Sequence, residues 1–157
     1  MSAALQYNHE HIGQSLADDY PYNALDHDCD FNNAINNDHY CHARDVFNFP
    51  VNDVVSFRNA IQEGAVSIGV STVGWKSYFG GIMSAEECEG EITHGVVAMG
   101  YGHDEELGMD YWLIRNSWGP RWGESGFVRV QRDFENAANN GCNSAEINSY
   151  ARVTAEE

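Results

Sequence analysis

The sequence has 157 residues, 43% of them hydrophobic and four of them tryptophan, which is enough apolar material for one domain or for a domain with part of a neighbour. Its 24 acidic and 8 basic residues give a net charge of −16, which disfavours nucleic-acid binding and adsorption to anionic membranes. The acidic surface fits a soluble, acid-tolerant protein, and alternatively a cationic partner or an acidic compartment. No run approaches the roughly 20 apolar residues of a membrane-spanning helix.

Residues 1–45 are polar, rich in His and Asn, and only weakly periodic. Residues 4–7 are expected to lie near the end of a helix that stops near Gly13, and residues 20–22 (Tyr-Pro-Tyr) are expected to form a turn. The start of the chain lacks the charged region, the apolar stretch and the cleavage site of a secretory signal. We expect no signal peptide here.

The clearest predicted helix ends at Gly64. Asn52 or Asp53 offers an N-cap, because a short polar side chain can accept a hydrogen bond from the first turn. The apolar residues that then recur at helical spacing are Val54, Phe57 and Ile61.

Strand patterns dominate after Gly64. The predicted strands are residues 65–70, 95–102, 110–117 and 126–132, which are apolar or alternate between apolar and polar and are separated by glycine-containing turns. A largely β second half thus follows one helix and a polar lead-in, which predicts an α+β fold.

Three side chains in this half form a recognisable chemical pattern. His94 lies 22 residues before Asn116, and Trp118 follows closely. A cysteine peptidase needs an imidazole beside its thiolate, a neutral amide that holds this imidazole in one tautomer, and an aromatic ring that keeps water from their hydrogen bond. The three residues fit these roles if the strands that carry them are neighbours.

With these residues in place, the chain resembles a papain-family (cathepsin-like) cysteine peptidase, specifically its C-terminal two-thirds. The resemblance rests on three segments: residues 93–96 (Thr-His-Gly-Val), 100–102 (Gly-Tyr-Gly) and 111–127, which contains Asn-Ser-Trp-Gly-x-x-Trp-Gly. Residues 20–22 with Cys29, and residues 78–82, also match family runs. The resemblance implies a papain-like fold, with residues 1–45 a remnant of the helical left domain and residues 46–157 a β-barrel-like right domain.

The resemblance also implies roles for further residues. Cys88 and Cys142 match a family disulfide, the alternative being two free buried thiols. The positions that match the non-prime specificity pocket are Gly69, Gly95 and Ile147. Such a pocket would be roomy, apolar and without a charge at its base, and would prefer a bulky hydrophobic side chain. His94 would act as acid and base in peptide hydrolysis through an acyl-enzyme, oriented by Asn116.

The sequence departs from the family pattern at the nucleophile, which is a Cys followed by Trp. The four cysteines precede Asp30, His42, Glu89 and Asn143 instead. The upstream Gln of the oxyanion hole has no counterpart, and the Gly-Gly segment that pairs with substrate would lie before Met1. We therefore expect this polypeptide alone to hydrolyse nothing. Thr93, where relatives carry Asp or Asn, would alter the pH profile rather than abolish the chemistry.

The polar lead-in holds further candidate ligands. In the family the partner of Cys29 would lie outside this sequence, so Cys29 is expected to be free, bridged to Cys41, or bridged to another chain. A soft-metal site is an alternative for the cluster His27, Cys29, His39, Cys41 and His42, but this spacing matches no compact zinc motif. A calcium loop of the EF-hand type at residues 26–31 is rejected, because Phe31 stands where Gly is needed. We expect no metal and no cofactor.

Three hypotheses about function stay open at this point. The chain is part of an enzyme whose nucleophile comes from a separate polypeptide, with peptides or proteins as substrates. Alternatively it is a non-catalytic structural or binding subunit, with a protein partner covering the surface where the helical half would pack. A third possibility is that the natural sequence continues upstream of Met1. The family resemblance suggests a lysosome, a vacuole or secretion, whereas the residues themselves leave the compartment unknown.

Overall fold

The computed structural model describes residues 2–11, 13–23, 25–26, 28, 40–135 and 140–155. The chain divides into two compact units, one spanning Asn48–Tyr150 and the other formed by Ser2–Phe47 together with the chain from Ala151. The division expected from sequence, near residue 45, stays a prediction. No helix in the described part of the chain is long and apolar enough to cross a bilayer.

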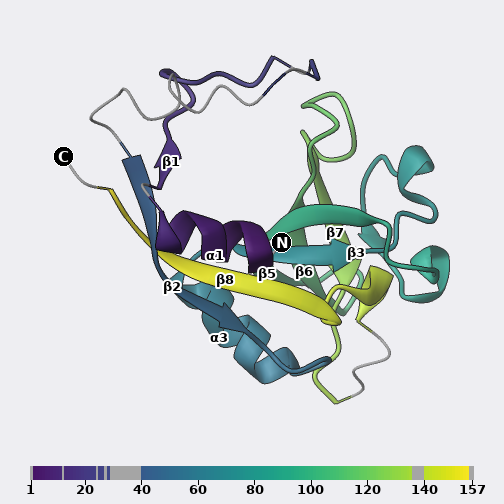
Figure 1. Ribbon diagram of the computed structural model, residues 1–157. Helices are drawn as coiled ribbons and strands as arrows, with labels where there is room; N and C mark the ends of the chain where they lie inside the picture. Colours follow the sequence, from purple (N-terminus) through teal and green to yellow (C-terminus); the bar gives the residue numbers. More distant parts are fainter. Residues whose placement is uncertain are drawn as a thin grey trace. The chain divides into compact units, whose positions relative to one another are not determined.

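The Asn48–Tyr150 unit contains one helix and most of a sheet (Figure 1). Its elements are α3 (Val54–Glu63), β3 (Val66–Val70), β4 (Ile82–Met83), β5 (His94–Asp104), β6 (Met109–Arg115), β7 (Phe127–Gln131) and the first residues of β8 (Ile147–Ala155). The short 3₁₀ turns among its described residues are η1 (Trp75–Ser77), η2 (Glu86–Cys88) and η4 (Gly141–Asn143). The strand order is β8-β3-β5-β6-β7-β4, antiparallel except for the parallel pair β4 and β7.

Helix α3 forms where the sequence predicts it. The side chain of Asp53 accepts a hydrogen bond from the backbone N–H of Ser56 at 3.0 Å, which satisfies one of the donors that a helix start leaves without a partner. The residues that α3 buries are Val54, Phe57, Ala60 and Ile61, which form one stripe at helical spacing. The prediction of an amphipathic helix ending at Gly64 is confirmed.

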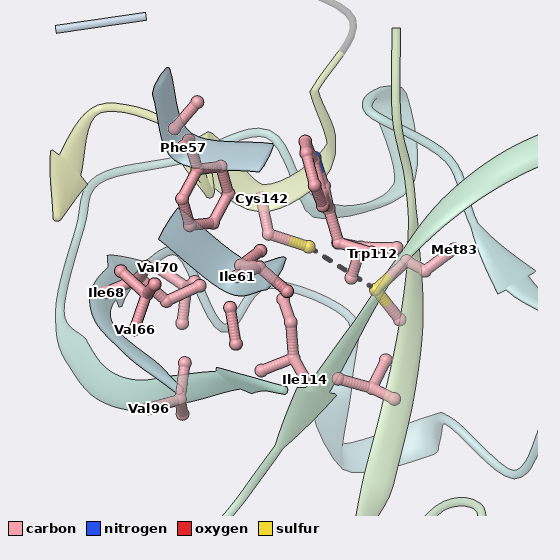
Figure 2. Close-up of a cluster of buried hydrophobic side chains, with 14 of the residues drawn as sticks. Phe57, Ile61, Val66, Ile68, Val70, Met83, Val96, Trp112, Ile114 and Cys142 are labelled. Atoms are coloured by element: carbon pink, nitrogen blue, oxygen red, sulfur yellow. Dashed lines mark hydrogen bonds between the residues drawn. The ribbon is translucent and has the colours of Figure 1, made fainter. Parts of the chain in front are cut away.

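The core of this unit lies between α3 and one face of the sheet (Figure 2). Alternate strand residues point into it, and those that are 0% exposed include Val66, Ile68, Val70, Ala98, Trp112, Ile114, Val128 and Val130. A register shift between Ala98 and Gly100 interrupts the alternation in β5. The strands predicted from alternation are confirmed, and so is the α+β class.

A disulfide between Cys88 and Cys142 joins turns η2 and η4 across a sequence separation of 54 residues. Both cysteines are fully buried, and the indole N–H of Trp75 donates to the Cys142 sulfur at 3.2 Å. The pairing implied by the family resemblance is confirmed, and the alternative of two free buried thiols is wrong.

The second unit contains α1 (Ser2–Glu10), β1 (Gln14–Ser15) and β2 (Tyr40–Asn48), with the strand order β1-β2-β8. Two hydrogen bonds hold α1 to β2: the backbone N–H of Ala43 donates to the Asn8 Oδ1 atom, and the His9 Nδ1–H donates to the Ala43 carbonyl, both at 2.7 Å. The short helix before Gly13 is confirmed. The long strand β2 lies where the sequence indicated only a polar lead-in.

The proposed soft-ligand cluster lies mostly outside the described residues, since His27, Cys29 and His39 are among those not described. The Cys41 thiol is free and half-buried. Among the described residues, no group of three or more His, Cys, Asp or Glu side chains is placed to hold a metal ion.

Candidate active site

His94 and Asn116 lie at the same edge of the sheet. His94 is the first residue of β5, and Asn116 directly follows Arg115, the last residue of β6. The two strands are antiparallel neighbours with Val97 opposite Arg115, so the start of one lies beside the end of the other. The sheet thereby closes the 22-residue separation between the imidazole and the carboxamide.

The His94 Nε2 atom lies 2.9 Å from the Asn116 Oδ1 atom. The same Oδ1 atom accepts a hydrogen bond from the backbone N–H of Ser117 at 2.8 Å. A backbone N–H can only donate, so the carboxamide atom that it contacts must be the oxygen. This oxygen can only accept, so the proton in the hydrogen bond with His94 resides on Nε2. The Nδ1 atom of His94 is then the ring nitrogen that can accept a proton.

The carboxamide is held in place by burial as well. Asn116 is 7% exposed, and among the described residues its Nδ2 group has no hydrogen-bond acceptor. His94 is half-buried, so one part of the ring is anchored against Asn116 while another part reaches solvent. This is the arrangement that an acid–base residue requires, because a reacting group must approach the free nitrogen.

Aromatic rings cover the pair. The Trp118 ring centroid lies 5.5 Å from that of His94 with an interplanar angle of 30°, and the fully buried Trp75 ring meets the imidazole edge-on at 6.3 Å. Trp75 also stacks on Trp122 at 5.5 Å, and its carbonyl accepts the Trp122 indole N–H at 2.9 Å. Excluding water from one side of the His94–Asn116 hydrogen bond strengthens it electrostatically.

The loop that carries Trp118 and Trp122 depends on glycine. Gly119 and Gly123 have φ of 89° and 53°, and a Cβ at Gly123 would lie 2.5 Å from the Phe127 carbonyl oxygen. The backbone N–H of Asn116 donates to the Gly126 carbonyl at 2.9 Å and closes the loop. The spacing of Asn-Ser-Trp-Gly-x-x-Trp-Gly thus follows from the turns that bring Trp118 against His94 and Trp122 against Trp75 and Trp118.

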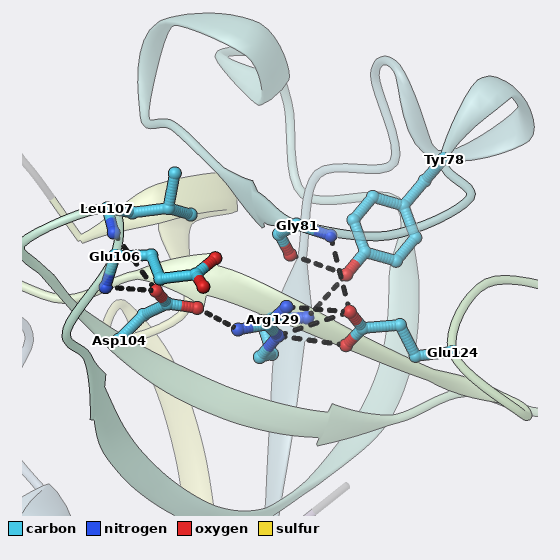
Figure 3. Close-up of polar contacts among 7 residues, drawn as sticks. All are labelled: Tyr78, Gly81, Asp104, Glu106, Leu107, Glu124 and Arg129. Atoms are coloured by element: carbon cyan, nitrogen blue, oxygen red, sulfur yellow. Dashed lines mark hydrogen bonds and ion pairs between the residues drawn. The ribbon is translucent and has the colours of Figure 1, made fainter.

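An ion-pair network holds the far end of this loop (Figure 3). Glu124 and Arg129 form a bidentate pair in which the carboxylate accepts two hydrogen bonds. The Arg129 Nε–Glu124 Oε2 distance is 2.9 Å and the Nη2–Oε1 distance is 2.8 Å. Arg129 also reaches Asp104 at 2.6 Å, and Glu124 accepts from the Gly81 N–H at 3.2 Å. One guanidinium therefore joins β7, the end of β5 and the loop after Asn116.

The ion-pair network changes the pKa values of its side chains. Partial burial favours a raised pKa for Glu124, but the hydrogen bonds from Arg129 outweigh it, and the pKa of Glu124 lies below its usual range. Hydrogen bonds from the Leu107 N–H and from Arg129 lower the pKa of Asp104, and the hydrogen bonds to Glu124 raise the pKa of Arg129. Burial raises the pKa of Tyr78, whose hydroxyl donates to the Gly81 carbonyl.

Replacing Arg129 with methionine is expected to lower the free energy of unfolding by about 2 kcal/mol, because it leaves Glu124 without its charged partner. The carboxylate pKa values are lowered in the fold, so this contribution is complete above the usual carboxyl range and is lost as pH falls through the folded pKa. Urea unfolding at neutral and acidic pH measures both effects. The exposed Arg121→Met is the control, and an equal loss at both pH values would contradict the assignment.

The three positions predicted to line a substrate pocket lie in register across three strands. Gly69 in β3 pairs with Gly95 in β5 on one side and with Ile147 in β8 on the other, directly beside the pairing of Val70 with His94. Their backbones therefore form one continuous row next to the imidazole. That they bind substrate stays a prediction.

Sequence reasoning did not single out Trp75, and it gave no separate role to Trp122 or Arg115, which appear only as members of the family motif in residues 111–127. Trp75 contacts the site only through tertiary packing, and the one signal for it was the unusual number of tryptophans in the sequence. Arg115 lines a pocket of about 350 Å³ together with Asn116, Ser117, Gly119, Pro120, Ser125, Gly126 and Phe127. Asn116, the hydrogen-bond partner of His94, is therefore one of the residues that line this pocket.

The comparisons with known proteins agree with this geometry. The sequence matches the pattern of the family described as papain family cysteine protease over residues 1–152. The chain therefore belongs to the papain family of cysteine proteases, as the sequence motifs predicted.

Relatives and solved structures support the same assignment. Oryzain beta chain from Oryza sativa subsp. japonica is 38% identical over 152 residues, covering 96% of this chain and 31% of that protein. Cathepsin L from Sarcophaga peregrina is 35% identical over 159 residues, covering 98% of this chain and 44% of that protein. This chain thus spans less than half the length of these curated relatives.

The papain-like fold is also seen in solved structures. The bromelain protease from Ananas comosus in complex with the E64 inhibitor superposes with a TM-score of 0.82 at 28% identity, over 94% of this chain and 66% of that one. The cysteine protease CMS1MS2 from Carica candamarcensis in complex with E-64 gives 0.79 at 33% identity, over 94% and 65%. The predicted papain-like fold is confirmed.

Proposed function

We propose that this chain supplies the histidine–asparagine part of a cysteine-peptidase active centre. The observation that carries the proposal is the 2.9 Å contact between His94 Nε2 and Asn116 Oδ1, with the buried carboxamide oriented by the Ser117 N–H and the imidazole packed against Trp118. An isolated structural histidine has no need of an oriented amide and an aromatic cover. His94 is the acid–base residue, Asn116 orients it and Trp118 shields their contact.

The chemistry follows from the tautomer. His94 Nδ1 takes the proton of a cysteine thiol, and the resulting thiolate attacks the carbonyl carbon of a peptide bond. The imidazolium then gives its proton to the leaving amine as the C–N bond breaks, which leaves an acyl-enzyme that water hydrolyses with His94 acting again as base. Neither step requires a metal or an organic cofactor.

The nucleophile for this reaction is a cysteine outside these 157 residues. Cys88 and Cys142 are joined to one another, and neither Cys29 nor Cys41 precedes a tryptophan as the family nucleophile does. The polypeptide by itself is therefore inactive, and turnover requires a segment that brings a Cys-Trp pair and an oxyanion-hole glutamine.

The row of Gly69, Gly95 and Ile147 supports a substrate class. Two glycines in adjacent strands present no side chain, so the surface beside His94 has room for a large group. None of the three residues carries a charge. The substrate is accordingly a peptide or protein with a bulky hydrophobic residue in the non-prime pocket.

A non-catalytic binding subunit is the second candidate. The observation that favours it is exposed apolar area on the Asn48–Tyr150 unit, where Phe79 is 86% exposed, Met99 43% and Trp118 41%. Apolar surface of this kind marks protein-binding faces. In this case a partner would cover the surface without supplying a nucleophile.

The deciding experiment mixes the purified chain with polypeptide segments that carry the glutamine and the Cys-Trp pair of the papain-family pattern. Thiol-dependent cleavage of a fluorogenic peptide with Phe or Leu in the non-prime position is the expected result, together with covalent labelling of the added cysteine by E-64. Binding of such segments without turnover would overturn the catalytic proposal and support the binding subunit. Covalent labelling by E-64 of a cysteine in the 157-residue chain, with no segment added, would overturn the statement that the chain alone is inactive.

A further inference from the structure

One guanidinium of the Asn48–Tyr150 unit lies among three aromatic side chains. Arg132 directly follows β7, and its side chain is only 7% exposed. Its Cζ atom lies between 4.4 and 5.3 Å from the centres of three rings, those of Phe134, Tyr101 and Trp112. The electron-rich faces of such rings attract a cation while the rings exclude water from it.

A second guanidinium shares one of these rings. Arg58, in α3, has its Cζ atom 5.2 Å from the centre of the Phe134 ring. Gln62 lies one helical turn further along α3 and donates to the Tyr101 hydroxyl at 2.7 Å, which fixes this face of the helix against the aromatic group. Two positive charges are therefore neighbours in a protein with 24 acidic and only 8 basic residues.

Only one of the two guanidiniums has a carboxylate partner among the described residues. Asp110 pairs with the Arg132 Nη2 group at 2.9 Å and also contacts the His103 Nδ1 atom at 2.8 Å. Burial and the nearby Arg58 lower the pKa of Arg132 in spite of this pairing. The Arg58 Nη2 group donates instead to the neutral Asn59 Oδ1 atom at 3.3 Å. The pair of arginines thus keeps an excess of positive charge.

Both arginines also have donors that no described protein group uses. The Nε atoms of Arg58 and Arg132 are buried, and neither has a hydrogen-bond acceptor in the part of the chain that the structure describes. Leaving buried donors without an acceptor is unfavourable. An oxyanion suits two neighbouring guanidiniums, because each of its oxygens accepts several hydrogen bonds and its charge offsets the excess positive charge.

The surroundings of the two arginines define the size and charge of such an anion. Asp110 neutralises one guanidinium, so one positive charge is left for the ligand. Asp133 and Glu135 flank Phe134 in the sequence and disfavour a ligand with many negative charges. Phe134 is 38% exposed, so an apolar group attached to the anion can pack against its ring.

We propose that Arg58, Arg132 and Phe134 form a binding site for a small organic monocarboxylate with an apolar body. The site is separate from the active centre, because Asp110 lies near the start of β6 and Asn116 follows the end of this strand. Six residues of extended chain span about 20 Å. Binding at this site needs no nucleophile, so it is independent of the function proposed above.

The test uses benzoate as the probe and benzamide as its neutral equivalent of nearly the same shape. Two-dimensional NMR of the whole chain follows the backbone amides together with the arginine Nε–H signals. Benzoate should shift the signals of Arg58, Arg132 and Phe134 in a saturable way. Benzamide at the same concentration should leave these signals nearly unchanged.

Arg58→Gln should weaken the benzoate affinity about tenfold, because it removes the guanidinium that has no carboxylate partner among the described residues. Arg121→Gln removes the same charge from an exposed position and is the matched control. Its benzoate affinity should equal that of the unmodified chain. The dispersion of the spectra shows whether each variant is folded.

Sulfate at matched ionic strength tests the charge of the ligand, and it should bind more weakly than benzoate. Sulfate that bound as tightly as benzoate would overturn the assignment to a monocarboxylate. Equal responses to benzoate and benzamide, shifts confined to the surroundings of Asn116, or an unchanged affinity in Arg58→Gln would each overturn the site itself.

Discussion

Replacing His94 with alanine is expected to lower thiol-dependent hydrolysis by the complemented assembly about 10³-fold or more, because the thiol loses its base and the leaving amine loses its acid. Asn116→Ala is expected to cost about 10²-fold, since the strand and Trp118 still hold the imidazole while its tautomer is no longer fixed. In both variants kcat should fall much more than KM rises, because neither residue belongs to the proposed substrate pocket.

The measurement is the initial rate on the fluorogenic peptide over a range of substrate concentrations, with unfolding curves of each variant as the check on folding. His103→Ala is the matched control: His103 also lies on β5, is paired with Asp110 at 2.8 Å and is largely exposed. Its rate should equal that of the unmodified chain. A His94→Ala assembly that retained most of its turnover would show that another group moves the proton.

The site was predictable from the sequence because its pattern is local. Asn116, Trp118, Gly119, Trp122 and Gly123 lie within eight residues along the chain, so the turn that joins them can be recognised without knowing the fold. Helix α3 was predictable for the same reason, since its cap and its apolar stripe are both local features. Predicting the contact between His94 and Asn116 also required the assumption that the strands carrying them are neighbours in the sheet.

Strands β2 and β8 were not predicted, although each has nine residues. The sequence of β2, Tyr-Cys-His-Ala-Arg-Asp-Val-Phe-Asn, mixes charged and apolar residues without strict alternation, and Ala43 is buried within it. Such a strand forms because neighbours supply its backbone hydrogen bonds, with little help from its own side chains. Local periodicity therefore carries little information about it.

The contacts of Arg129 escaped prediction for a related reason. Its partners come from separate segments, Asp104 from the end of β5 and Glu124 from the loop after Asn116, and the Tyr78 hydroxyl accepts the Arg129 backbone N–H from a third segment. No spacing rule connects these four residues. Only the folded sheet brings them together, so an ion-pair network that supports the active-site loop becomes visible only in the structure.

Removing the disulfide by a Cys88→Ala and Cys142→Ala double substitution is expected to lower the free energy of unfolding by about 4 kcal/mol. Closing a loop of 54 residues restricts the unfolded chain by about this amount in the chain-entropy model. Alanine is chosen because both positions are buried, and a serine hydroxyl there would lack a hydrogen-bond partner.

Removing the disulfide should also perturb the active site. Cys142 and Asn143 have φ of 59° and 61°, a conformation that side-chain-bearing residues rarely adopt, and the disulfide helps to hold this turn. Without the sulfur, the Trp75 indole N–H loses its acceptor, and Trp75 is the buried ring that meets His94 edge-on.

Urea unfolding of the oxidised chain and of the double variant gives the energy difference, and tryptophan fluorescence of the folded states reports on the environment of Trp75. Cys41→Ala removes a free thiol in the other compact unit and serves as the control, with an expected change below about 1 kcal/mol. A double variant as stable as the control would contradict this prediction. It would mean that strain from the disulfide in the folded state cancels the stabilisation that comes from restricting the unfolded chain.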